Sequence, residues 1–173
     1  MGNKKTLLTI IVAIVSAIIS FTVVFLVLNN ETPKTFTKLE MQIQLTNKFA
    51  EKDLISQTAY YESRDMVVTA LREGFDLAPG ISSWSLTTYA QNCLKANNLT
   101  GIEIHTSEKG NYTYFIYEKS LNGKSYTYLA TCHKSQSAFW LIQFGTYTSK
   151  FESSKDKMFT YIDSIIFDAS SQY

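Results

Sequence analysis

Histidine, cysteine and glycine are scarce in this chain, which narrows the chemistry it can support. The 173 residues include only two histidines, two cysteines and seven glycines. Two histidines without a supporting acidic cluster make a poor metal site, and the spacing of Cys93 and Cys132 matches no zinc or redox motif. No glycine-rich phosphate loop is present either. We therefore expect no metal, nucleotide or other cofactor.

An excess of one charge is also missing. Sixteen basic and fifteen acidic residues leave a formal charge of +1, and neither sign forms a long block. Nucleic-acid binding needs a basic footprint, so nucleic acid is excluded as an expected partner. Cys132 and His133 are adjacent, and adjacent strand residues point to opposite faces, so they do not form a catalytic dyad. His105 lies in a predicted strand next to polar residues, and no catalytic constellation stands out in the sequence. We predict that the protein is not an enzyme.

One long apolar run stands out near the N-terminus. Residues 7–28 contain no charged residue, and at about 1.5 Å per residue these 22 residues span about 33 Å, enough to cross a bilayer. The alternative is a cleaved signal peptide, whose apolar region is usually about 7–15 residues and ends in small residues. This run is longer and ends in Val-Leu-Asn-Asn, so we favour an uncleaved signal anchor.

The flanking residues predict the topology. Lys4 and Lys5 precede the apolar run, which places residues 1–6 in the cytoplasm and the rest of the chain outside the cell membrane as a single-pass protein. Lys34 and Lys38 follow on the other side, so the reverse orientation stays open as an alternative. Residues 29–38 are polar and contain a proline, which predicts a linker. A domain at 39–167 and a tail at 168–173 complete the organisation.

The remaining sequence alternates between the periods of strands and helices. Alternating apolar residues predict a strand over 39–46, and two β-prone runs at 56–63 and 66–74 suggest a hairpin, although helix formers in the second run leave a helix as its alternative. The segment 75–83 contains Pro79-Gly80 and reads as a loop. Apolar residues at helical spacing predict helices over 85–98 and 154–167, the first capped by Ser85 and the second by Ser153 or Ser154. Further strands are predicted at 102–106, 111–119, 124–132 and 138–147.

The turn between two of these strands is the clearest local signal. Asn122-Gly123 separates two aromatic, β-branched runs, the typical sequence of a tight β-hairpin. Short turns between most strands favour antiparallel pairing, and the two helices need a sheet to cover. The predicted class is therefore α+β: a transmembrane helix, then an antiparallel sheet covered by helices in an α/β/α sandwich.

Three segments of the domain resemble the PsbP and Ran-binding Mog superfamily, which includes bacterial membrane-anchored extracytoplasmic proteins. They are the opening strand 41–45 leading to Phe49, the helix entry 85–90, and the ending in which 140–144 is followed by 151–166 with its Ile-Asp-Ser-Ile sequence. The resemblance covers about 39–167 and rests on patterns. It implies an α/β/α sandwich and a role in binding or assembly, with partners that differ among members.

Tyrosines supply the candidate binding surface. Several lie on predicted neighbouring strands and can share a sheet face, although packing beneath a helix is the alternative. The residues we single out are Trp84, Tyr112, Tyr114, Tyr126 and Tyr128. Cys93 and Cys132 are either one disulfide or two buried thiols. The predicted function is a membrane-anchored binding or assembly module that contacts another envelope protein or polymer; a subunit of a secretion or conjugation apparatus and an envelope hydrolase are the alternatives.

Overall fold

Antiparallel strand pairing organises residues 30–168, the part of the chain that this computed structural model describes. The predicted cytoplasmic tail (1–6), the predicted membrane helix (7–28) and residues 169–173 of the predicted tail lie outside the described residues. Within residues 30–168, no helix combines the length and the apolar character needed to cross a membrane.

The larger sheet has seven strands in the order β3-β4-β5-β9-β8-β7-β6, all antiparallel to their neighbours. Its strands are β3 (Ala50–Glu51), β4 (Ala59–Glu62), β5 (Val67–Gly74), β6 (His105–Thr106), β7 (Thr113–Leu121), β8 (Lys124–Lys134) and β9 (Ala138–Tyr147). The β4–β5 hairpin is confirmed, and β5 is a strand along its whole length. The β7–β8 hairpin turns at Asn122 and Gly123, whose φ angles of 51° and 73° are those of a type I′ turn.

A smaller sheet has the strand order β1-β2-β10, with β1 (Pro33–Lys38), β2 (Met41–Thr46) and β10 (Ile166–Phe167). Strand β1 corrects the prediction that all of 29–38 is a linker, because Pro33–Lys38 pairs along its whole length with β2. Phe36 is the buried apolar side chain of this strand. One buried residue among polar neighbours gives no alternating pattern, so the sequence did not reveal the strand.

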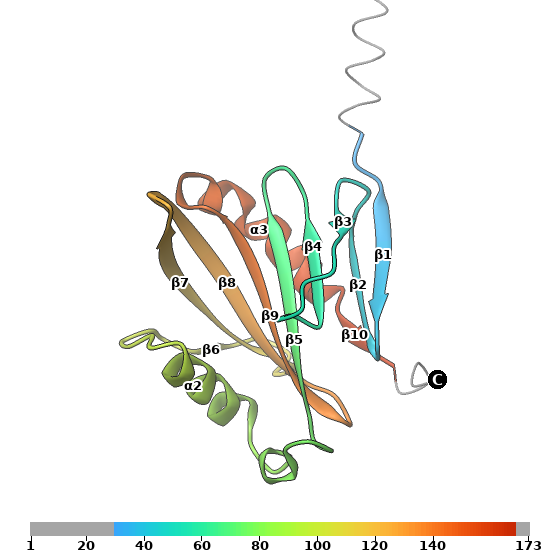
Figure 1. Cartoon of the computed structure of the whole chain (residues 1–173), viewed down its shortest axis with the longest axis vertical. Coiled ribbons are helices and arrows are strands. Elements are labelled where there is room, and N and C mark those ends of the chain that lie inside the picture. The colour runs from blue at the N-terminus through green and yellow to red at the C-terminus, as the bar shows by residue number, and fades with distance from the viewer. Residues whose placement is uncertain (1–29, 169–173) are drawn as a thin grey trace, which may run out of the picture. The chain divides into compact units, whose positions relative to one another are not determined.

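Two α-helices lie on opposite faces of the larger sheet (Figure 1). Helix α2 (Leu86–Ala96) begins as predicted at Ser85, whose hydroxyl accepts a hydrogen bond from the Thr88 amide. Its apolar stripe packs on Phe139 and Leu141. Helix α3 and the smaller sheet cover the other face, where Trp140 is fully buried. The predicted antiparallel α+β architecture is confirmed, with a second sheet added.

The C-terminal helix differs from its predicted bounds of 154–167. Helix α3 (Phe151–Asp163) follows the 3-10 turn η2 (Thr148–Lys150), and neither Ser153 nor Ser154 caps it. The chain then leaves the helix after Asp163 and joins β2 through β10. The prediction was wrong because Ile165 and Ile166 continue the helical spacing of apolar residues, whereas pairing with Met41 and Gln42 keeps this segment extended.

Candidate functional site

The tyrosines that the sequence singled out are divided between the two faces of the larger sheet. In the β7–β8 register, Tyr117 stands opposite Tyr128, and residues directly opposite each other in antiparallel strands share a face. Tyr126 and Tyr128 therefore lie on the face that α2 contacts. Tyr112 and Tyr114 lie on the face that α3 contacts. The four candidate tyrosines therefore form two pairs on opposite faces of the sheet.

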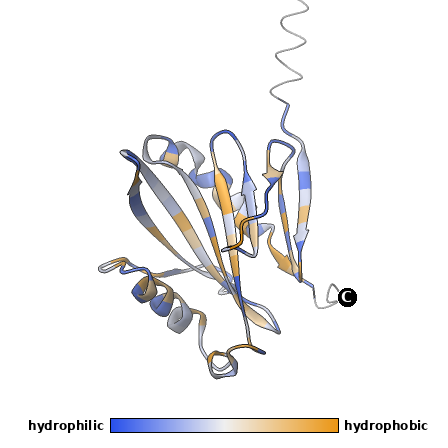
Figure 2. Cartoon of the chain, viewed as in Figure 1, coloured by the Kyte–Doolittle hydropathy of each residue, from blue (hydrophilic) through white to orange (hydrophobic). Residues whose placement is uncertain are grey.

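Five tyrosines do share the α2 side of the sheet, and we call them the tyrosine face: Tyr60, Tyr117, Tyr126, Tyr128 and Tyr147. The apolar side chains of α2 cover Ala130, Cys132 and Phe139, toward one end of this side of the sheet. The β7–β8 turn lies at the end of the sheet away from α2 (Figure 1), and the tyrosine face lies nearer that turn. Figure 2 shows that the strand ends at this turn are mainly hydrophilic.

Ring stacking gives the tyrosine face a defined surface. The rings of Tyr117 and Tyr128 are 5.0 Å apart and nearly parallel, at 10°. Those of Tyr126 and Tyr147 are also 5.0 Å apart, at 26°. Such offset pairs hold aromatic side chains in one arrangement. The surface is thus partly ordered before any partner binds.

Gly145 allows the central ring to lie against the sheet. This glycine stands opposite Tyr128 in the β8–β9 register. A Cβ atom at position 145 would lie 2.6 Å from a ring carbon of Tyr128, which is closer than side chains pack. Only glycine leaves room for the ring there. The Tyr128 ring therefore lies over the β9 backbone at Gly145.

The chemistry of this face is that of neutral hydrogen-bonding aromatics. Burial raises the pKa of Tyr117 to about 12 and raises the pKa values of Tyr60 and Tyr128. These phenols consequently keep their protons at neutral pH, and the Tyr117 hydroxyl donates to the side-chain oxygen of Gln143. Flat aromatic area with hydroxyl donors is typical of protein recognition surfaces.

Trp84 lies apart from these tyrosines. It immediately precedes the N-cap of α2 and packs, partly buried, against the core beneath that helix. The Nζ of Lys134 donates to the Trp84 carbonyl at 3.1 Å and to the Ser82 carbonyl at 2.7 Å. This position fits the packing role of a residue that joins the loop to the helix, and it does not extend the tyrosine face.

The two cysteines meet between α2 and the sheet. Cys93 on α2 and Cys132 on β8 are both buried and both free thiols. The neighbouring Cys93 and burial raise the pKa of the Cys132 thiol. His133 points to the opposite face, where its ring packs against Tyr112 and Phe167. The separation of Cys132 from His133 expected from strand geometry is confirmed.

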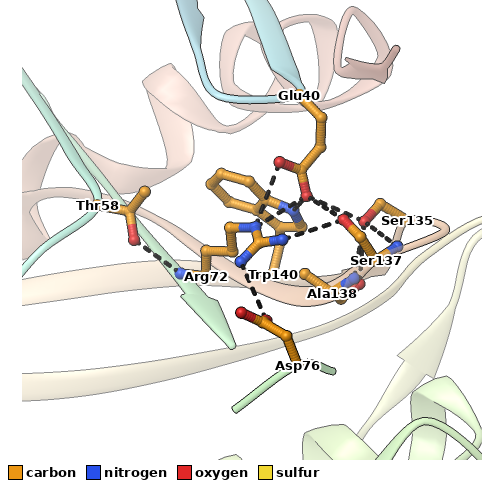
Figure 3. A network of polar contacts seen from close by, with 8 residues as sticks. All are labelled: Glu40, Thr58, Arg72, Asp76, Ser135, Ser137, Ala138 and Trp140. Carbon is orange, nitrogen blue, oxygen red and sulfur yellow. Dashed lines mark hydrogen bonds and ion pairs between the residues drawn. The ribbon is translucent and has the colours of Figure 1, made fainter. Parts of the chain in front are cut away.

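A buried ion pair was missed by the sequence reasoning (Figure 3). Arg72 Nε lies 3.0 Å from Glu40 Oε1, and the same carboxylate oxygen accepts hydrogen bonds from Ser135, Ser137 and the Trp140 indole. Although burial alone would raise it, hydrogen bonds from its own backbone amide, Arg72 and Ser137 lower the pKa of the Glu40 carboxyl. The network joins the β1–β2 turn to the larger sheet.

Comparisons with known proteins identify the fold. No family model and no curated protein matches the sequence. The Ran-binding protein Mog1p of Saccharomyces cerevisiae is similar at a TM-score of 0.51 and 10% identity, over 83% of this chain and 100% of that one. A Bacteroides thetaiotaomicron protein reaches 0.52 at 13% identity, over 79% of this chain and 49% of that one. Cyanobacterial PsbP of Synechocystis sp. PCC 6803 reaches 0.45 at 11% identity, over 80% and 92%.

The chain therefore has the fold of Mog1p, in agreement with its sequence resemblance to the superfamily that includes Mog proteins. Identities of 10% to Mog1p and 13% to the Bacteroides protein show a likeness of fold alone. A fold hosts many functions, so the function has to be argued from the residues of this chain.

Proposed function

We propose that this protein is a membrane-anchored binding module whose domain lies outside the cytoplasm and contacts an envelope protein through the tyrosine face. The observation that carries the proposal is the grouping of five tyrosines on the α2 side of the sheet, of which Tyr117 also packs against the apolar cluster beneath that helix. Tyrosine offers large contact area at a small cost in side-chain entropy, which makes it common at binding surfaces. The uncharged run 7–28 supplies the anchor.

The order of elements disfavours a subunit of a secretion or conjugation apparatus. Domains of the nuclear-transport-factor type in such subunits normally place helices before the sheet. In residues 30–168 the first α-helix, α2, follows five strands. A hydrolase is disfavoured by the positions of the two imidazoles, because His133 is buried among aromatic rings and His105 stacks on Tyr114.

The anchor and its orientation predict a protease result. A C-terminal epitope tag should be removed by protease added to spheroplasts, because the domain lies outside the cytoplasmic membrane. An N-terminal tag should survive until detergent dissolves the bilayer, since Lys4 and Lys5 hold that end inside. Immunoblotting of both tags gives the answer. A protected C-terminal tag, or a domain that remains soluble after membranes are sedimented, would contradict the proposal.

The tyrosine face predicts a loss of partner binding. Replacing Tyr126 and Tyr147 together by serine should weaken partner binding by about 2 kcal/mol, or about 30-fold in Kd, because both rings would leave the interface. Benzoylphenylalanine at position 126 should first trap the partner in native membranes. The purified partner then allows Kd to be measured by calorimetry.

The matched control is the double variant Ile55→Ser and Leu77→Ser, which also removes two exposed apolar side chains. It should leave Kd within twofold of the parent value. Thermal unfolding of all three proteins should show similar midpoints. Equal binding by the tyrosine variant and the control, or cross-linking from position 55 but not from 126, would exclude the tyrosine face as the contact.

A further inference from the structure

A cavity of about 360 Å³ lies on the opposite side of the sheet from the tyrosine face, between α3 and the segment joining β6 to β7. Its lining includes Glu108, Tyr112, Tyr114, Phe159 and Asp163. Two of these residues, Tyr112 and Tyr114, were singled out from the sequence. Their separation from Tyr126 and Tyr128 gives them a site of their own.

Aromatic rings form the walls of this cavity. Tyr114 and Phe159 meet edge to face, with ring centroids 5.3 Å apart at 84°. Tyr112 lies 6.3 Å from Tyr114 at 55°, and His105 stacks on Tyr114 at 5.0 Å. Rings held at large angles to each other present both faces and edges to a shared space. The face of an aromatic ring attracts a cation through its quadrupole.

A carboxylate completes the lining. Asp163 is the last residue of α3, and its Oδ1 accepts a hydrogen bond from the Tyr112 hydroxyl at 3.2 Å. The C-terminal end of a helix carries partial negative charge, so an aspartate there is unfavourable for the helix itself. The last turn of α3 contains no basic residue that would offset it. Glu108 and Lys109 add one charge of each sign, and the cavity keeps a net negative charge.

We propose that this cavity binds a primary alkylammonium group, either that of a lysine side chain or that of a small free amine. The alkyl chain would lie against the rings of Tyr114 and Phe159 on the side that lines the cavity, and the ammonium would face Asp163. Because Tyr112 already engages Oδ1, the ammonium would donate to Oδ2. Three N–H donors suit this carboxylate better than a quaternary group, which has none. The inference concerns a different face from the proposed function and stands independently of it.

Titration with n-butylammonium, followed by aromatic NMR signals, tests the proposal. Signals of Tyr114 and Phe159 should shift and saturate in the millimolar range, whereas the neutral isostere n-butanol should bind at least fivefold more weakly. Asp163→Asn and, separately, Phe159→Leu should each weaken binding at least fivefold. Glu152→Gln removes a charge from the first turn of the same helix and should change nothing.

A second ligand distinguishes the two sources of the ammonium. Tighter binding of Nα-acetyl-lysine methylamide than of n-butylammonium supports a lysine of a polypeptide, and the reverse order supports a free amine. Thermal unfolding establishes that each variant is folded. If Asp163→Asn does not fold, Phe159→Leu still tests the site. Equal affinity for n-butanol and n-butylammonium, or unchanged affinity in both folded variants, would overturn the proposal.

Discussion

Replacing Arg72 by methionine is expected to lower the free energy of unfolding by about 3–5 kcal/mol, because it leaves the buried Glu40 carboxylate without its ionic partner. The side chain of Glu40 is only 4% exposed and that of Arg72 18%. Methionine keeps much of the arginine's apolar length while removing the charge and its donors. The serine hydroxyls and the Trp140 indole still reach the carboxylate, but none of them carries a positive charge.

Urea denaturation of the domain measures this loss. The matched control is Lys38→Met, which removes the cation of an exposed pair with Glu51 and should cost about 0–1 kcal/mol. The double variant Glu40→Gln with Arg72→Met should recover part of the lost stability, since no charge is then left buried. A loss below 1 kcal/mol for Arg72→Met would mean that the ion pair does not stabilise the junction between the two sheets.

The buried position of Glu40 also explains where sequence reasoning failed at the first predicted strand. The alternation in 39–46 placed Leu39 inside and Glu40 outside. The structure reverses both, with Leu39 51% exposed and Glu40 3% exposed. Leu39 has a φ of 52°, so it belongs to the β1–β2 turn and shifts the strand start to Met41. Alternation of buried and exposed side chains holds only inside a strand. Leu39 and Glu40 lie in the turn that the pairing of β1 with β2 creates, and the sequence gives no sign of β1.

The division of the tyrosines between the two faces of the sheet is predictable from a local sequence signal, the turn between β7 and β8. The Asn122-Gly123 turn pairs Leu121 with Lys124, because a two-residue loop determines the register of a hairpin. Even-numbered residues of β8 then stand opposite odd-numbered residues of β7. Tyr126 and Tyr128 must therefore lie on the face away from Tyr112 and Tyr114.

Tertiary pairings were beyond local reasoning. Tyr147 joins the tyrosine face only because β9 pairs with β8, and Asp163 reaches Tyr112 across 51 residues of sequence. By contrast, α2 was found almost to its ends, because an apolar stripe, the Ser85 cap and the terminal asparagines all agree. Local sequence signals thus predicted most helices and strands. The set of residues that forms each site depends instead on which helices and strands pack together in the fold.

Acidification is expected to destabilise the domain through His133, starting well above the range in which carboxylates titrate. Burial lowers the pKa of His133 to about 3, against about 6.5 in the unfolded chain. Its Nε2 lies 3.0 Å from Thr131 Oγ1. That hydroxyl donates to the Ile142 carbonyl, so its oxygen accepts from Nε2–H, and burial keeps the ring neutral.

The sign follows from which state binds the proton. Above pH 6.5 the imidazole is neutral in both states, and its contribution does not vary. As the pH falls below 6.5, His133 binds a proton in the unfolded chain, whereas in the folded domain it does not bind one until about pH 3. Stability is therefore lost at about 1.4 kcal/mol per pH unit, or about 2.7 kcal/mol by pH 4.5. Urea midpoints measured between pH 7.5 and 4.5 give this slope.

His133→Phe removes the titrating group while keeping an aromatic ring beside Tyr112 and Phe167, and it should flatten the slope between pH 6.5 and 5. The matched variant His105→Gln removes the other imidazole, whose side chain is 42% exposed, and should retain the parent slope. The Glu40 carboxyl, with its lowered pKa, protonates below this window and does not obscure it. Equal stability of the parent domain at pH 7 and pH 5 would contradict this prediction. It would mean that His133 binds its proton in the folded state, so that the core around Trp140 admits water more easily than its packing indicates.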